Sequence, residues 1–316
     1  MDYPANVKVA VVTHGTDPQP IGEGIRSVLN DAEIALATIA GERITLPTTT
    51  AAGALTEASY IFDRDSATAF IDASAALATD APTGDNGDSY GLGVLVADAA
   101  SRGARQFIVS LSGLTLLDGG AGVLVALGVP PLNAQGQMLP KGGAALVDLD
   151  DFDTAKLNVP AAAADWIFVT DTEDGVDTTH PGMARLIEFS GVDPTTPGMG
   201  AGGALPVALT WLSSVIHGSA DHVRLVPREE LIDANLIVTS GLPTSAFSAT
   251  HVVSAEEGDD LAEQGKQAAV DYLTISTVQG KQAGTSKFSS CSSSTGSAGS
   301  SASGVMMRDS AIASWL

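Results

Sequence analysis

Residues 107–128 read FIVSLSGLTLLDGGAGVLVALG, and this stretch decides the fold class. It starts with a short, mostly apolar run, 107–111, of the kind found in buried strands of parallel sheets. It ends with a run of apolar residues at 121–127, closed by Gly128 in the position of a helix C-cap. A strand that leads through a short turn into a helix is the repeating unit of α/β proteins.

The turn between this strand and this helix is a candidate binding site. It contains Gly113, Gly119 and Gly120, together with one carboxylate, Asp118. Ligands of open α/β sheets bind beyond the carboxyl ends of the strands, and glycines allow the backbone to come close to them. A tight turn that binds no ligand is the alternative interpretation, because such turns occur throughout α/β domains.

The composition limits the classes of partner. The chain has 316 residues, enough for one large domain or two modest ones, and 44% of them are hydrophobic. Lys and Arg number 15 against 37 Asp and Glu, which gives a formal charge of −22. A field of this sign repels nucleic acid and anionic lipid, so we expect neither as a partner.

The termini and the single cysteine suggest a location. Cys291 cannot form an internal disulfide, and the first residues show no signal-peptide pattern. No apolar run reaches the ~20 residues of a membrane span. We therefore expect a cytoplasmic protein without a membrane segment. The stretch from 285 to 316 is rich in Ser and Gly and is predicted to be a disordered tail.

The rest of the chain predicts two lobes. Strand-helix patterns at 1–39, 86–129 and 161–284 favour a Rossmann-like core lobe with a parallel sheet. Short, closely spaced strand patterns at 40–85 favour hairpins, and we assign them with 130–160 to a smaller, mixed α/β lobe.

Further candidate groups follow other predicted strands. Asp171 comes directly after the strand pattern of 164–170, where a carboxylate can bind Mg²⁺ or a hydroxyl group; a solvated turn is the alternative. Gly198, Gly200 and Gly203 fit the spacing G-x-G-x-x-G, but no apolar strand precedes them. Close helix packing or approach to an anion therefore explains that loop better than a dinucleotide site. The acidic residues at 148–153 lack the spacing of a calcium loop.

Six motifs, in order, resemble those of the bacterial glycerate kinase family of the two-lobed α/β type. The most specific is DGGAGVLVALG at 118–128, which is similar to the family's NDGGAGMLQALG. The other five are YGLGVL at 90–95, KGG at 141–143, VTD at 169–171, PGMGAGG at 197–203 and DANLIVT at 233–239. Together they extend the resemblance over roughly residues 7 to 250.

The resemblance implies a kinase that transfers the γ-phosphate of ATP to a glycerate-type hydroxy acid with Mg²⁺. It implies that Asp171 holds the metal or orients the substrate hydroxyl, and that Asp118 faces phosphate or substrate. It further implies that the backbone around Gly113, Gly119, Gly120, Gly200 and Gly202 binds the nucleotide. The partners would be a small hydroxy acid and a nucleotide, and a homodimer is a candidate assembly.

Three loops depart from the family pattern. The family's Ser, Thr and Asn correspond here to Leu114, Leu116 and Leu117, the first loop (14–19) has no lysine, and 239–245 lacks the family's Glu, Arg and Asp. Phosphoryl transfer depends on positioned charges and hydrogen-bond donors. The alternative hypothesis is therefore an inactive homologue that binds a small molecule or regulates another protein. A scaffold that binds no small ligand is a third.

Overall fold

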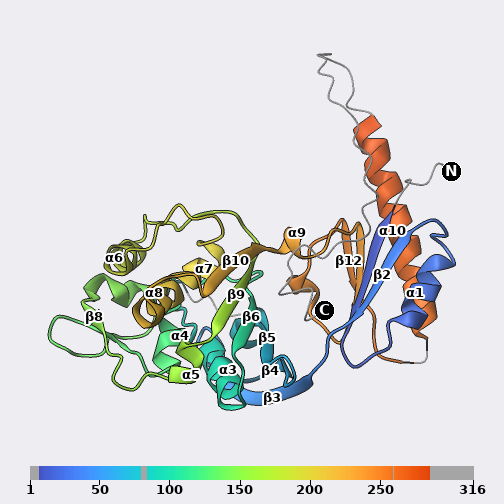
Figure 1. Ribbon diagram of the computed structural model, residues 1–316. Coiled ribbons are helices and arrows are strands. Elements are labelled where there is room, and N and C mark those ends of the chain that lie inside the picture. The colour runs from blue at the N-terminus through green and yellow to red at the C-terminus, as the bar shows by residue number, and fades with distance from the viewer. Residues whose placement is uncertain (1–6, 80–83, 259, 285–316) are drawn as a thin grey trace. The chain divides into compact units, whose positions relative to one another are not determined.

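The computed structural model describes residues 7–79, 84–258 and 260–284 (Figure 1). The described residues form two compact units, one within 7–39 and 229–284 and one within 40–228. The predicted fold class is confirmed, since the first unit contains a parallel four-stranded sheet and the second a separate, mixed six-stranded sheet. The predicted tail at 285–316 lies outside the described residues.

The first unit is built on a parallel sheet in the order β12-β11-β1-β2. Its strands are β1 (Lys8–Thr13), β2 (Glu33–Thr38), β11 (Leu236–Ser240) and β12 (His251–Ser254). Helix α1 (Gln19–Arg26) packs against α10 (Leu261–Gly284), as Figure 1 shows. The two helices come so close at Gly24 that a Cβ there would lie 1.8 Å from the carbonyl oxygen of Ala262.

The second unit contains the six-stranded sheet, in the order β10-β9-β6-β5-β4-β3. Its strands are β3 (Glu42–Thr49), β4 (Leu55–Asp63), β5 (Thr68–Asp72), β6 (Gln106–Ser110), β9 (Asp165–Thr170) and β10 (Val223–Pro227). The first three form the expected antiparallel hairpins, whereas β5, β6, β9 and β10 run parallel. The carboxyl ends of these four strands therefore lie along one edge of the sheet.

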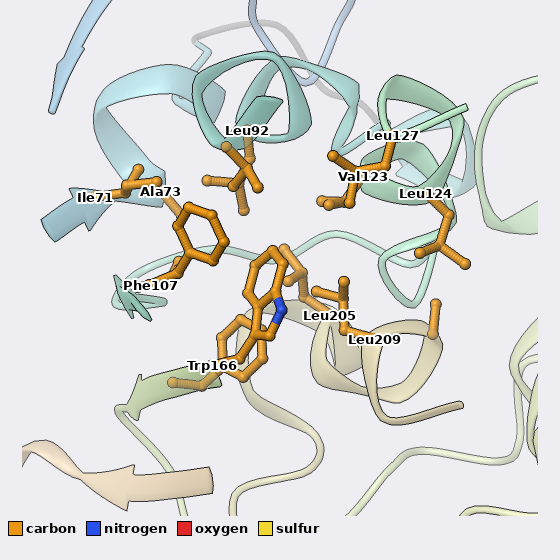
Figure 2. Close-up of a cluster of buried hydrophobic side chains, with 14 of the residues drawn as sticks. Ile71, Ala73, Leu92, Phe107, Val123, Leu124, Leu127, Trp166, Leu205 and Leu209 are labelled. Atoms are coloured by element: carbon orange, nitrogen blue, oxygen red, sulfur yellow. The ribbon is translucent and has the colours of Figure 1, made fainter. Parts of the chain in front are cut away.

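The helices of the second unit bury one large apolar cluster against this sheet (Figure 2). They are α2 (Ala73–Leu77), α3 (Tyr90–Ser101), α4 (Ala121–Ala126), α5 (Val159–Ala162), α6 (Pro181–Ser190), α7 (Ala201–Ala204) and α8 (Pro206–His217). Phe107 and Trp166, on neighbouring strands, lie at the centre of the cluster with ring centroids 4.7 Å apart. Such contacts hold the strands in place, and with them the loops that begin at the strand ends.

Shorter elements complete the chain. They are β7 (Pro131–Leu132) with β8 (Asp151–Phe152), helix α9 (Arg228–Leu231) and three 3₁₀ turns, η1 (Gly84–Asn86), η2 (Gly143–Asp148) and η3 (Thr244–Ala246). Among the residues that the structure describes, no helix is long and apolar enough to cross a membrane.

The structure divides the chain differently from the lobes expected from the sequence. We expected 86–129 and 161–284 to join the N-terminal strand in one parallel core and 40–85 to form a smaller lobe. Instead β6, β9 and β10 continue the sheet that the β3–β5 hairpins begin, and the mixed sheet lies in the longer unit. The reason is that β5 pairs in parallel with β6, through the crossover of residues 73–105. An apolar run predicts a buried strand but does not specify its partner.

Candidate functional site

The carboxyl edge of β5, β6, β9 and β10 brings several polar side chains together. Ser110 ends β6 and Thr170 ends β9, and the loops that follow contain Ser112, Gly113 and Asp171. The side chains of Ser110 and Thr170 are fully buried, and their hydroxyl oxygens have no hydrogen-bond partner within the described residues. Buried hydroxyls without a partner are uncommon in a folded protein, so this edge is the first place to look for a site.

Asp171 and Gly113, both predicted as site residues, are in direct contact. The backbone N–H of Gly113 donates a hydrogen bond of 2.8 Å to Oδ2 of Asp171. Asp171 is half-buried, whereas Gly113 is exposed, with φ +72° and no atom near the position of a Cβ. The other carboxylate oxygen of Asp171 makes no hydrogen bond within the described chain. The carboxylate can therefore accept a proton or bind a cation while its orientation stays fixed.

Arg228 reaches the same turn from the end of β10. Its Nη1 donates a hydrogen bond of 2.9 Å to Oγ of Ser112, the residue before Gly113. Sequence analysis did not single out this arginine. A signal for it was present, because a basic residue directly after a parallel strand is conspicuous in a chain of charge −22.

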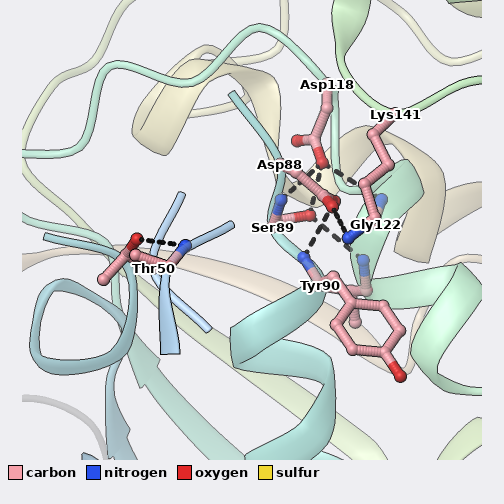
Figure 3. Close-up of polar contacts among 9 residues, drawn as sticks. Thr50, Asp88, Ser89, Tyr90, Asp118, Gly122 and Lys141 are labelled. Atoms are coloured by element: carbon pink, nitrogen blue, oxygen red, sulfur yellow. Dashed lines mark hydrogen bonds and ion pairs between the residues drawn. The ribbon is translucent and has the colours of Figure 1, made fainter. Parts of the chain in front are cut away.

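Asp118 lies at a different place, in the interior, and Figure 3 shows its polar contacts. Only 1% of its surface is exposed, and it accepts hydrogen bonds from Ser89 N (2.8 Å), Ser89 Oγ (2.7 Å), Gly120 N (3.1 Å) and Gly122 N (3.1 Å). Burial raises the pKa of the Asp118 carboxyl, and the hydrogen bonds from Ser89 oppose that rise. This carboxylate fastens the beginning of α3 to the beginning of α4.

A second carboxylate, Asp88, supports the same junction (Figure 3). Its Oδ1 accepts the N–H of Tyr90 at 3.0 Å, and its Oδ2 pairs with Lys141 Nζ at 2.7 Å. The Lys141 ammonium also lies 4.7 Å from the centre of the Tyr90 ring. The lysine of the Lys-Gly-Gly motif is therefore engaged in holding the start of α3.

Close packing explains three of the remaining predicted glycines, and backbone conformation explains the fourth. A Cβ would lie 2.3 Å from Leu186 Cδ2 at Gly119 and 2.3 Å from the Leu205 carbonyl oxygen at Gly120. At Gly200 it would lie 2.3 Å from the Gly175 carbonyl oxygen. At Gly202 the nearest atom would be 3.4 Å away, and there the φ of +58° is what favours glycine. Gly119, Gly120 and Gly202 are also buried. Their role in nucleotide binding stays a prediction.

Two of the three leucines of the 112–118 loop, Leu114 and Leu116, pack inward. Leu116 belongs to the apolar cluster with 3% of its surface exposed, and Leu114 packs against that cluster. These positions therefore contribute no polar side chain to the edge.

In the first unit, the loop after β1 is joined to β11 by the bond from His14 N to the Ser240 carbonyl oxygen (2.8 Å).

No group of three or more His, Cys, Asp or Glu side chains able to hold a metal ion occurs within the described residues. Asp171, the predicted metal ligand, is therefore not part of such a group of three within the described residues. A Mg²⁺ ion bound together with a phosphorylated ligand needs only one or two protein carboxylates, with water and phosphate oxygens as the other ligands. The residues present fit that mode of binding and do not fit an all-protein cage.

Comparisons with known proteins all point to one family. Residues 22–176 match the sequence model of the glycerate kinase family. The chain is 30% identical over 149 residues to an uncharacterized protein of Synechocystis sp., a segment that covers 39% of each chain. It is 33% identical over 111 residues to the glycerate 2-kinase of Escherichia coli, covering 34% of this chain and 29% of that protein.

A further relative is the glycerate kinase of Halalkalibacterium halodurans, 39% identical over 70 residues, which are 22% of this chain and 18% of that one. The matched segments thus span well under half the length of these relatives. A crystal structure of a protein assigned as glycerate kinase 2 from Salmonella typhimurium has the same fold, with a TM-score of 0.58 at 18% identity over 88% of this chain and all of that one. On the match to the family model and to these relatives, the chain belongs to the glycerate kinase family.

Proposed function

We propose that this protein catalyses ATP-dependent phosphorylation of a small, glycerate-type hydroxy acid, with Mg²⁺ as the metal. Membership of the glycerate kinase family supports the reaction class. The observation that carries the proposal is the contact between Asp171 and the Gly113 turn, which orients a half-exposed carboxylate at the carboxyl edge of the sheet. A cytoplasmic location, where ATP is available, fits the proposal.

In this proposal the two carboxylate oxygens of Asp171 have different roles. Its Oδ2 is held by Gly113, so its other oxygen can accept the proton of a substrate hydroxyl or bind the metal. When bound, Mg²⁺ neutralises charge on the phosphates of ATP. Gly113 allows the close approach of a phosphate, since nothing lies near the position of its Cβ. Asp118 contributes indirectly, as a positioning residue that fixes the α4 end of the 112–118 loop.

A second candidate is an inactive relative that still binds a ligand. The packing of Leu114 and Leu116 into the core favours it, because these positions provide no donors for phosphate oxygens. Loss of one well-placed donor reduces the rate of an enzyme by roughly 10²-fold or more. The loop at 14–19, without a lysine, points in the same direction.

We expect MgATP and D-glycerate each to raise the melting temperature of the protein. A ligand at ten times its Kd stabilises the folded state by about 1.4 kcal/mol, which corresponds to a rise of about 2–4 °C for a domain of this size. Differential scanning fluorimetry with each ligand measures the effect, and glycerol with MgCl₂ is the control. Stabilisation without turnover would favour the inactive relative. Absence of any shift with either ligand would contradict both candidates and favour a scaffold.

A further inference from the structure

Arg228 differs in its partner from five other basic side chains of the described chain. Lys8, Arg102, Lys141, Arg185 and Lys266 each form an ion pair with a carboxylate. Arg228, which is half-buried, instead bonds the neutral hydroxyl of Ser112, and within the described residues no carboxylate lies within ion-pair distance of it. No carboxylate therefore takes up its donors as an ion-pair partner, although the protein carries an excess of 22 negative charges.

The geometry around Arg228 is suited to an oxyanion. A guanidinium group has five N–H donors in a planar fork that matches a carboxylate or a phosphate, and only one donor is used by Ser112. Because the Ser112 oxygen accepts from Arg228, its own hydroxyl hydrogen is available to donate to the same anion. Ser112 is 8% exposed, so the bond to Arg228 is largely shielded from water. Charge-assisted bonds are strong in such surroundings.

The turn at Ser112–Gly113 places this cation beside the candidate catalytic carboxylate. Arg228 is bonded to Ser112 and Asp171 to the next residue, Gly113, and consecutive Cα atoms lie about 3.8 Å apart. A 2-hydroxy acid has its hydroxyl and its carboxylate on adjacent carbons. Such a molecule is short enough to present the carboxylate to Arg228 and the hydroxyl to Asp171. Without Arg228, Asp171 and the net charge of the protein would repel it.

We propose that Arg228, held by Ser112, binds the oxyanion of the ligand whose hydroxyl or metal-bound phosphate Asp171 engages. The proposal rests on the proposed function in one respect, namely that substrate binds at the carboxyl edge of β5, β6, β9 and β10 beside Asp171, here called the Asp171 edge. The oxyanion is the carboxylate of the hydroxy acid or a phosphate of the nucleotide. Where the oxyanion is that carboxylate, Arg228 sets the specificity of this edge for an anionic hydroxy acid over a neutral polyol.

Isothermal titration calorimetry of the full chain tests this proposal, with D-glycerate, glycerol and MgATP as separate titrants. The variants are Arg228→Gln and Ser112→Ala, with Arg105→Gln as the matched control. Arg105 is exposed and precedes β6, at the opposite edge of the same sheet, so its loss changes the net charge equally. We expect Arg228→Gln to weaken binding of one anionic titrant by about 10–100-fold, Ser112→Ala to weaken it less, and Arg105→Gln to leave it unchanged.

The titrant affected identifies the anion. Loss confined to D-glycerate identifies its carboxylate, and loss confined to MgATP identifies a phosphate. Equal affinity of the Arg228→Gln and wild-type proteins for both titrants would overturn the proposal, as would an equal loss in Arg105→Gln. Wild-type protein that binds neither titrant at about 10 mM would overturn it as well.

The proposed function has a separate readout. Arg228-dependent binding without turnover would overturn the kinase activity and leave the anion site standing. Turnover that is unaffected by Arg228→Gln would support the kinase activity and overturn the anion site.

Discussion

The Asp118→Ala substitution is expected to lower the free energy of unfolding by about 3–5 kcal/mol. Four donors at the beginnings of α3 and α4 converge on this buried carboxylate, and alanine leaves all of them without a partner. A buried donor without a partner costs about 1–3 kcal/mol, and the losses here belong to one network. Urea unfolding followed by circular dichroism measures the change.

Asparagine at the same position separates hydrogen bonding from charge. Its amide oxygen can replace Oδ2, which accepts three of the four bonds, while its NH₂ group would face the N–H of Gly120. We expect Asp118→Asn to lose about 1–3 kcal/mol, less than alanine. Asp65→Ala, at an exposed turn carboxylate, is the control with a change below about 0.5 kcal/mol. Equal stability of all three variants would contradict the role of Asp118 as a structural junction.

The Asp171→Asn substitution is expected to reduce turnover by about 100-fold or more while leaving the melting temperature unchanged. The amide oxygen of asparagine can keep the bond from Gly113 N, so the turn remains in place. What is lost is the negative charge that binds a metal and the capacity to accept a proton. Coupled detection of ADP release at saturating Mg²⁺ and ATP measures the rate.

Glu173→Gln is the matched control for this experiment. Glu173 lies two residues beyond Asp171 in the same loop and is exposed, so the variant removes the same charge without touching the Gly113 turn. Its turnover should equal that of the wild-type protein. A similar loss in both variants would show that the general charge of the loop matters, and Asp171 would then have no special role.

Much of the fold was predictable because burial leaves a clear pattern in the sequence. The apolar runs at 107–111 and 164–170 predicted β6 and β9. Helix α6 (181–190) and strand β12 (251–254) were not predicted. In β12 none of the four residues is fully buried, so an edge strand of this kind gives a weak signal.

The division into units could not be predicted from these patterns. Pairing of β5 with β6 depends on which sheet the crossover at 73–105 returns to, and a local pattern does not contain that information. For the same reason, the sequence placed Asp118 and Asp171 in one site although only Asp171 lies at the carboxyl edge with Gly113. Glycines that serve close packing, such as Gly119 and Gly120, look the same in a sequence as glycines that approach a phosphate.

The central claim is that the Asp171 edge supports phosphoryl transfer, and ADP release by wild-type protein with Mg²⁺, ATP and D-glycerate tests it most directly. Glycerol in place of D-glycerate gives the background. The account predicts release that depends on D-glycerate and falls to background in Asp171→Asn, even though Leu114 and Leu116 are packed into the core. Release that does not exceed that of Asp171→Asn at high protein concentration would contradict the claim and assign the protein to the inactive relatives.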